Sequence, residues 1–170
     1  MASAYKPSND FPALARIMAG KPTIRQEALQ AFAAGSWTIM RDSRVEPDMW
    51  GVLPVLPEPE DQLVVPGWEK NRLLVPRIAE LVEAEPAVKA YSLSYLRPGG
   101  EIRPHRHDNP FVTAIITLHG GPDCYMKADG ERRDFREEEI IVFDYRRVHE
   151  ARNDGPVSWL ALLLLLDVAG

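Results

Sequence analysis

The amino-acid sequence predicts an α+β fold that is mainly β. A helical and loop-rich portion occupies residues 1–86, and a β-sandwich or barrel follows over residues 87–170. Short apolar segments recur after residue 87, and turn signals such as Gly99-Gly100 and Asp129-Gly130 separate them about every ten residues. Helical periodicity is concentrated in the first half. The length of 170 residues suits a single domain with a sizeable core.

Two helices are predicted in the first half. Residues 22–32 form the first, with Thr23 as a cap and Gly35 as the stop. Residues 75–83 form the second, because Pro76 stands near the first helical position, where proline is tolerated. The stretch over 50–55 is interpreted as part of a loop-rich region, since proline is frequent from there onward and disfavours central strands.

Five strands are predicted in the second half, on the basis of β-rich or alternating segments between turns. They cover residues 88–96, 111–118, 124–127, 139–143 and 157–168. Within the last strand, the apolar run over 159–166 predicts a strand buried on both faces. This run is too short to span a bilayer.

Composition narrows the possible functions. The 20 Lys and Arg residues and the 25 Asp and Glu residues give a net charge of −5, which argues against a nucleic-acid partner. Cys124 is the single cysteine, so neither an internal disulfide nor a cysteine-type zinc site is possible. We expect no membrane partner, and the N-terminus lacks the pattern of a signal peptide. The expected location is the cytoplasm.

The histidines carry the strongest chemical signal. His105 and His107 follow Pro104 at the end of a further predicted strand, and residues two apart in a strand share one face, so two imidazoles can converge on one metal ion. His149 lies before the last strand and could supply a third ligand. Imidazole suits iron, zinc, copper and nickel, so these residues alone do not select the metal. The alternative is that they are surface histidines, and His119 is interpreted as a turn residue.

Two segments resemble the aspartyl/asparaginyl β-hydroxylase family. They are residues 92–105, with the PG turn and the Pro-His pair, and residues 141–154, with Phe-Asp followed by His149 and Asn. The resemblance implies a double-stranded β-helix, which is a jelly-roll or cupin-like barrel. It also implies Fe(II), 2-oxoglutarate and O2, and hydroxylation of a small molecule such as an amino acid or its derivative.

Carried over by position, His105 and His149 match the two iron-binding histidines of the family. His107 stands where relatives have glycine or an acid, so a third imidazole could complete the iron site here. Ser94 matches a position that helps to hold 2-oxoglutarate. The family's arginine for the far carboxylate of 2-oxoglutarate is replaced by Trp159.

Other cations are therefore considered for the cosubstrate. Lys127 lies on a strand where some relatives in the wider superfamily keep a lysine, and Arg103 is close to the motif in sequence. An arginine fork binds a carboxylate through two charge-assisted hydrogen bonds, which tryptophan cannot replace.

Three functions remain open. The first is an Fe(II)- and 2-oxoglutarate-dependent hydroxylase, in which His105, His107 and His149 hold iron. The chain also resembles cupins in its Gly99 and His105-x-His107 segment. The second is a three-histidine iron oxygenase that binds its substrate directly and needs no 2-oxoglutarate, and the loss of the arginine favours it. The third is a barrel that binds metal or ligand without catalysis. A homodimer is also possible, since a barrel edge can pair with a second copy.

Overall fold

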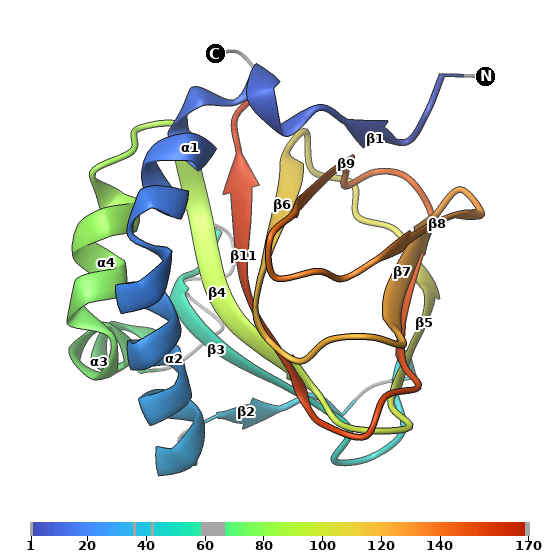
Figure 1. Cartoon of the computed structure of the whole chain (residues 1–170), viewed down its shortest axis with the longest axis horizontal. Coiled ribbons are helices and arrows are strands. Elements are labelled where there is room, and N and C mark those ends of the chain that lie inside the picture. Colours follow the sequence, from blue (N-terminus) through green and yellow to red (C-terminus); the bar gives the residue numbers. More distant parts are fainter. Residues whose placement is uncertain (1, 36, 42, 59–66, 169–170) are drawn as a thin grey trace.

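Two antiparallel β-sheets and a group of helices make up the fold. The computed structural model describes residues 2–35, 37–41, 43–58 and 67–168 (Figure 1). The larger sheet has the strand order β1-β9-β6-β11-β4-β3-β2. Its strands, in chain order, are β1 (Tyr5–Lys6), β2 (Thr38–Ile39), β3 (Trp50–Leu56), β4 (Val88–Leu96), β6 (Val112–His119), β9 (Ile140–Asp144) and β11 (Trp159–Leu166).

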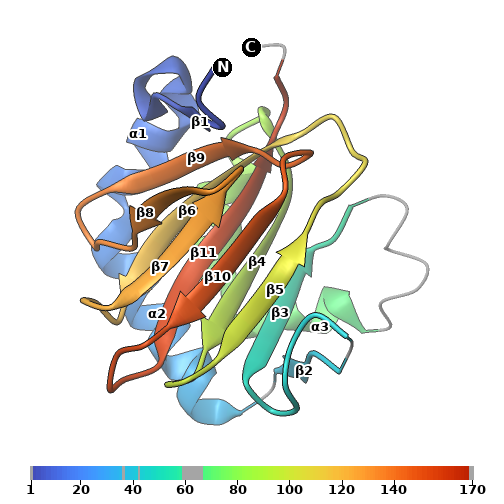
Figure 2. The same ribbon diagram turned by 90° about the vertical axis from the view of Figure 1, so that its right-hand side faces the viewer.

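The smaller sheet has four strands in the order β5-β10-β7-β8. They are β5 (Glu101–His105), β7 (Cys124–Ala128), β8 (Glu131–Asp134) and β10 (His149–Asn153). Figure 2 shows these strands lying over one face of the larger sheet. Side chains from both sheets meet between them, including Ile102 and Met126 from the smaller sheet and Ile115 and Phe143 from the larger one. The two sheets thus enclose the interior of a jelly-roll barrel.

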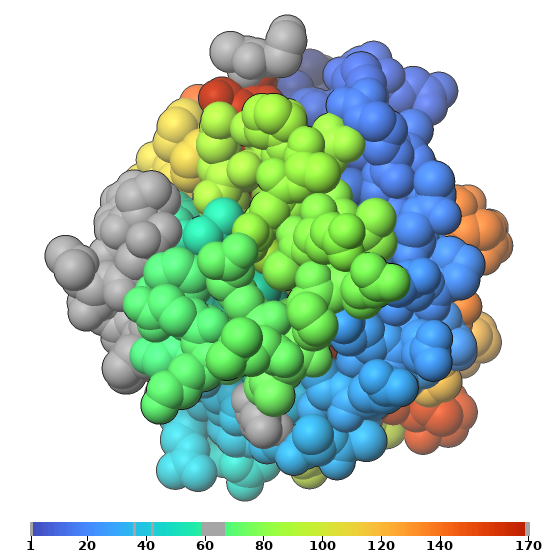
Figure 3. Space-filling view, turned by 90° about the vertical axis from the view of Figure 1, so that its left-hand side faces the viewer, coloured from blue at the N-terminus to red at the C-terminus, as the bar shows by residue number. Residues whose placement is uncertain are grey.

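The helices cover the other face of the larger sheet (Figure 3). A short 3₁₀ turn (Ser8–Asp10) precedes α1 (Pro12–Ala19) and α2 (Lys21–Ala34), and α3 (Trp68–Leu74) and α4 (Pro76–Glu83) follow β3. Their buried residues, such as Ile24 and Ile78, pack against Leu53 and Leu93 of the sheet. The helices are stabilised chiefly by this packing, since each is short for an isolated helix.

Strand β11 lies at the centre of the larger sheet, between β4 and β6. Its alternate residues point to opposite faces. Leu160 and Leu162 join the helix-side core, whereas Trp159 and Ala161 face the barrel interior. The predicted burial on both faces is confirmed, and it explains why the segment is a continuous apolar run.

The interpretation of residues 50–55 as loop is wrong, because these residues belong to strand β3. Strand β3 pairs with β4 along most of its length, with a register shift between Pro54 and Leu56. Its other neighbour, β2, pairs only with Gly51 and Val52. Pro54 therefore lies beyond the β2 pairing and beside a bulge, where a missing N–H breaks no ladder hydrogen bond.

The predicted mainly β fold is confirmed, and the predicted strand over 88–96 coincides with β4. The predicted helices over 22–32 and 75–83 correspond to α2 and α4. Strands β1, β2, β8 and β10 and helices α1 and α3 were not predicted. Among the described residues, no helix combines the length and the apolar character that a membrane crossing needs.

Candidate metal centre

Three histidines converge at one end of the barrel. His105 is the last residue of β5 and His149 is the first residue of β10, and the antiparallel pairing of these strands sets the two opposite each other. Their ring centres are 4.3 Å apart. With His107 they form a group in which one nitrogen of each ring lies within 4.8 Å of the others. Pairing of the two strands thus brings together residues that are far apart in the sequence.

The rings of His105 and His149 are oriented by the same backbone contact. Nδ1 of His105 donates to the carbonyl oxygen of Arg103 at 2.8 Å, and Nδ1 of His149 donates to that of Arg147 at 2.8 Å. A carbonyl can only accept, so Nδ1 carries a proton in both rings, and Nε2 is the nitrogen that lacks one when the ring is neutral. This leaves Nε2 of each ring with a lone pair for a metal ion.

His107 reaches the cluster in a different way. The prediction placed it on a strand with His105, but β5 ends at His105, so strand alternation is not the reason for its position. Instead, the backbone N–H of His107 donates to the carbonyl oxygen of Tyr145 at 3.2 Å. Its ring lies nearly parallel to the Tyr145 ring, with 3.8 Å between centres and an angle of 9°. Tyr145 therefore fixes both the backbone and the ring of His107.

The surroundings of the cluster favour neutral imidazoles. Burial, together with the neighbouring His149, His105 and Arg44, lowers the pKa of His107 to about 3. Burial also lowers the pKa of His149 to about 4, despite the opposing effect of its hydrogen bond to Arg147. Neutral imidazole is the form that binds metals, so the cluster is ready to bind a cation at neutral pH.

The donor set fits a single metal ion. A metal–imidazole bond is about 2.0–2.1 Å long, so two nitrogens on one ion are at most about 4.2 Å apart. Nitrogens within 4.8 Å of one another reach that spacing with small rotations of the rings. Three neutral nitrogens suit iron, zinc, copper or nickel better than calcium or magnesium.

A small cavity of about 60 Å³ lies inside the barrel beside this cluster. His149 lines it, and so does the predicted cosubstrate residue Ser94, whose Oγ accepts a hydrogen bond from Nε1 of Trp50 at 2.8 Å. Trp159 also lines it. The indole of Trp159 stacks on Phe135 at 4.3 Å and donates to Oγ1 of Thr117 at 3.2 Å. A packed aromatic pair therefore fills the place where the family has an arginine.

The other two predicted cosubstrate residues are not brought to this cavity. Lys127 alternates with the buried Met126 along β7, and its ammonium forms an ion pair with Glu150 at 3.1 Å. The guanidinium of Arg103 donates to the backbone oxygen of Ser43 and pairs with Glu46. The side chain of Lys127 is 39% exposed and that of Arg103 is 51% exposed, and neither lines the cavity.

The cavity consequently does not fit 2-oxoglutarate. Every arginine and lysine of the chain lies in the described residues, yet none of them lines the cavity. A carboxylate placed there would lose its hydration without gaining a cationic partner, which is costly. Arg44 is the cation whose charge acts on His107 and His149, and its guanidinium lies 5.4 Å from the centre of the Trp50 ring.

Sequence reasoning missed Tyr145 and Arg44. Tyr145 follows directly after the Phe143-Asp144 pair of the family-like motif, and this position was the only available signal. No pattern in the sequence connects Arg44 with the histidines, because the contact depends on how the segment before β3 packs beside β5. A bridge between Val45 and Ile102 makes that connection.

The fold and the cluster together define a cupin-like β-barrel with a three-histidine site. Residues 18–169 match the profile of the Aspartyl/Asparaginyl beta-hydroxylase family, and the chain belongs to this family. The predicted family resemblance is thus confirmed. Membership in a hydroxylase family on a cupin-like fold identifies the chain as a dioxygenase-type enzyme.

Solved structures resemble the fold at low sequence identity. A cupin-2 domain protein from Rhodospirillum rubrum is 8% identical, with a TM-score of 0.50 over 77% of this chain and 68% of that one. A prolyl-4-hydroxylase from Pseudomonas putida is 17% identical, with a TM-score of 0.49 over 85% of this chain and 86% of that one. The cupin domain of Schizosaccharomyces pombe Cnp3 is 10% identical, with a TM-score of 0.47 over 79% and 72%. No curated protein matches the chain.

Proposed function

We propose that the chain is a mononuclear non-haem iron oxygenase that acts on a small molecule and uses O2. His105, His107 and His149 would hold the iron. The observation that carries this proposal is the group of three imidazoles, whose ligand nitrogens lie within 4.8 Å of one another at the end of the barrel. Membership in a hydroxylase family supports the oxygenase chemistry.

The choice of iron follows from the reaction class. Hydroxylation with O2 requires electron transfer, which a bound iron ion would supply and which zinc cannot. The protein's part would be to hold the three imidazole nitrogens in place and to leave room for the substrate and O2. The hydrogen bonds from Nδ1 to the carbonyls of Arg103 and Arg147 perform the first task for His105 and His149.

We favour direct binding of the substrate without 2-oxoglutarate. The interior cavity is small, at about 60 Å³, and none of its described lining residues is a lysine or an arginine. The packed Trp159 stands in the position of the expected arginine. These features support the three-histidine oxygenase over the 2-oxoglutarate-dependent hydroxylase.

A 2-oxoglutarate-dependent hydroxylase is the second candidate, and Arg44 is the observation that favours it. Its charge acts on His107 and His149, although it does not line the interior cavity. An anion bound at these histidines would also be attracted by this positive charge. The variant Arg44→Gln therefore separates the two candidates.

The test is an anaerobic titration of the Fe(II)-loaded chain with 2-oxoglutarate, followed by visible absorption. We expect iron to be bound and no saturating charge-transfer band to appear. A band that saturates, and that Arg44→Gln removes, would establish the second candidate instead. A chain that binds no Fe(II) would contradict both.

A further inference from the structure

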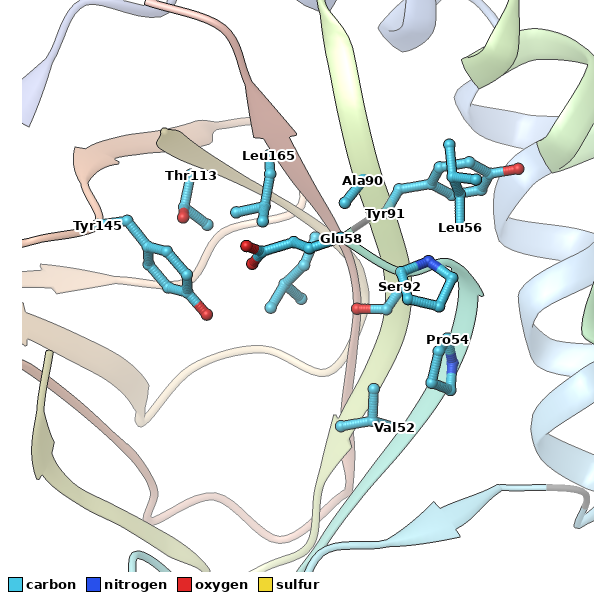
Figure 4. A pocket seen from close by; sticks show the side chains of 12 residues that line it. Val52, Pro54, Leu56, Glu58, Ala90, Tyr91, Ser92, Thr113, Tyr145 and Leu165 are labelled. Carbon is cyan, nitrogen blue, oxygen red and sulfur yellow. The ribbon is translucent and has the colours of Figure 1, made fainter. Parts of the chain in front are cut away.

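A second cavity of about 180 Å³ lies next to the metal centre (Figure 4). It shares Thr113, Tyr145 and Leu163 with the interior cavity, so the two spaces adjoin. Tyr145 stacks on His107, which places this cavity directly beside the cluster. Part of its wall is formed by the larger sheet, where Ser92 of β4 and Leu165 of β11 line it.

The charged group on the described wall of this cavity is negative. Glu58 is the one ionisable carboxylate among its described lining residues, and Figure 4 shows its carboxylate extending between Tyr145 and Ser92. None of the chain's arginines and lysines, all of them in described segments, belongs to the lining. An anionic ligand would therefore face a carboxylate, whereas a cationic one would gain a charge-assisted hydrogen bond.

Glu58 is also connected to the segment that carries His107. Both of its carboxylate oxygens accept from Nδ2 of Asn109, at 3.1 and 3.2 Å. Asn109 in turn accepts the N–H of Phe111 with Oδ1, at 3.3 Å. The carboxylate is thus held at a defined place on the cavity wall.

A buried hydroxyl points to a polar group on the occupant. Oγ1 of Thr113 has no hydrogen-bond partner, and the residue is only 1% exposed. Leaving a buried hydroxyl unpaired is unfavourable, and such groups are rare in native proteins. Because Thr113 lines both cavities, a ligand that extends from Glu58 toward the cluster passes this hydroxyl.

The rest of the wall limits the size and polarity of the ligand. Pro54, Leu163 and Leu165 give it an apolar surface. A volume of about 180 Å³ is below the range of about 300–1,000 Å³ that is usual for drug-sized ligands. The occupant is therefore a small molecule with an apolar chain.

We propose that this cavity is the substrate site of the oxygenase, and that it takes a small amine in its cationic form. The ammonium end would bind Glu58, and the apolar chain would run past Thr113 toward the three histidines. The inference rests on the proposed function, because it assigns the substrate class of that same metal centre.

The test uses the full-length, metal-free chain and three probes of equal length: n-pentylammonium, pentanoate and n-pentanol. Alkylamines are cationic at pH 7, since their pKa is close to that of lysine. In calorimetric titrations we expect pentylammonium to bind about tenfold or more tightly than pentanoate. Equal affinity of the two ions, or no binding of pentylammonium, would overturn the inference.

Two variants locate the binding. We expect Glu58→Gln to weaken pentylammonium binding about tenfold and to leave pentanol binding unchanged. The matched control Glu80→Gln, at a largely exposed carboxylate on α4, should change neither. Unchanged pentylammonium affinity in Glu58→Gln would assign the probe to another place and overturn the inference.

Thr113→Val keeps the shape of the side chain and removes the unpaired hydroxyl. We expect a higher Tm, because a buried unsatisfied group is lost, together with weaker binding of 1-amino-3-pentanol, which carries a hydroxyl in mid-chain. Unaltered affinity for that probe would remove Thr113 from the site.

Fe(II) binding by the same preparations separates the two proposals. If the chain binds iron but does not prefer pentylammonium over pentanoate, only the substrate assignment is overturned. If it prefers pentylammonium but binds no iron, only the metal centre is overturned.

Discussion

At the scale of single residues, Tyr145 determines where His107 lies. Its carbonyl oxygen accepts the backbone N–H of His107 at 3.2 Å, and its ring lies parallel to the imidazole at 3.8 Å. The phenol ring thus acts on the metal centre through His107, which makes Tyr145 a positioning residue. Residues that orient a metal ligand usually change metal affinity by about 10–100-fold when they are altered.

Tyr145→Leu is accordingly expected to weaken metal binding about tenfold, because the stacked ring is lost. Tyr145→Phe keeps the ring and should bind metal as the wild type does. Calorimetric titration of the three proteins with Ni²⁺, a stable probe for imidazole sites, measures the difference. Equal affinities in Tyr145→Leu and the wild type would show that stacking does not position His107.

The depressed pKa values of the histidines make the stability of the metal-free chain depend on pH. The pKa is about 3 for His107 and about 4 for His149, against about 6.5 for an unfolded histidine. Below about pH 6.5 the unfolded chain therefore binds more protons than the folded one. The free energy of unfolding should be highest above pH 6.5 and should fall as the pH falls toward 4.

His107→Phe removes one of these groups, so its loss of stability over that pH range should be smaller than in the wild type. Urea unfolding at a series of pH values gives both slopes. Identical slopes in His107→Phe and the wild type would contradict the burial of a neutral His107.

At the scale of elements, strand β11 decides what the barrel interior can bind. Trp159 begins this strand, is 3% exposed, and packs between Phe135 and Thr117. It pairs with Leu96 of β4, and the next residue, Leu160, pairs with His119 of β6. The strand thus places an indole in the interior, at the position where the family resemblance predicts a guanidinium.

Trp159→Arg should destabilise the chain by about 3 kcal/mol or more, because it removes the packed indole and buries a charge. Trp159→Phe keeps the contact with Phe135 and should cost about 1–2 kcal/mol. Denaturant unfolding of both variants checks the expectation. If Trp159→Arg were as stable as the wild type, the interior would have room for a cation, and the argument against 2-oxoglutarate would fail.

The turn between β10 and β11 depends on Asn153, which is 1% exposed. Its Nδ2 donates to the carbonyl oxygens of Leu96 and Val157 at 2.8 and 2.9 Å, and its Oδ1 accepts the N–H of Gly155 at 3.0 Å. Asn153→Ala should therefore lower the free energy of unfolding by about 3 kcal/mol, about 1 kcal/mol for each hydrogen bond. The neighbouring exposed variant Asp154→Ala should change it by less than about 0.5 kcal/mol. Similar values for the two variants would refute the role of Asn153.

At the scale of the whole molecule, two facing sheets enclose the interior cavity, and the pairing of β5 with β10 places the three histidines where these two strands meet. The sequence was sufficient to predict the strands of this barrel wherever apolar alternation is regular, as in β4. It failed at β3, because Pro54 resembles a strand breaker when its neighbours in the sheet are unknown. The short β2 and the bulge after Pro54 remove the conflict, and neither can be read from the residues alone.

The candidate site was also predicted in part: the sequence identified its three histidines but not the contacts that position them. The spacing of His105, His107 and His149 indicated a common metal, and the structure brings the three rings together. The reason given for His107 was wrong, since a loop contact and not a strand places it. Thr113 carried no signal, because an unpaired hydroxyl inside an apolar strand is visible only when its surroundings are known.

The central claim is that three histidines hold one iron ion, and the amount of bound Fe(II) per chain tests it most directly. After anaerobic loading and dialysis, we expect one equivalent in the wild type and in His119→Ala. His105→Ala and His149→Ala should retain almost none, and His107→Ala should retain less than the wild type. Full occupancy in His105→Ala or His149→Ala, or no iron in the wild type, would contradict the account.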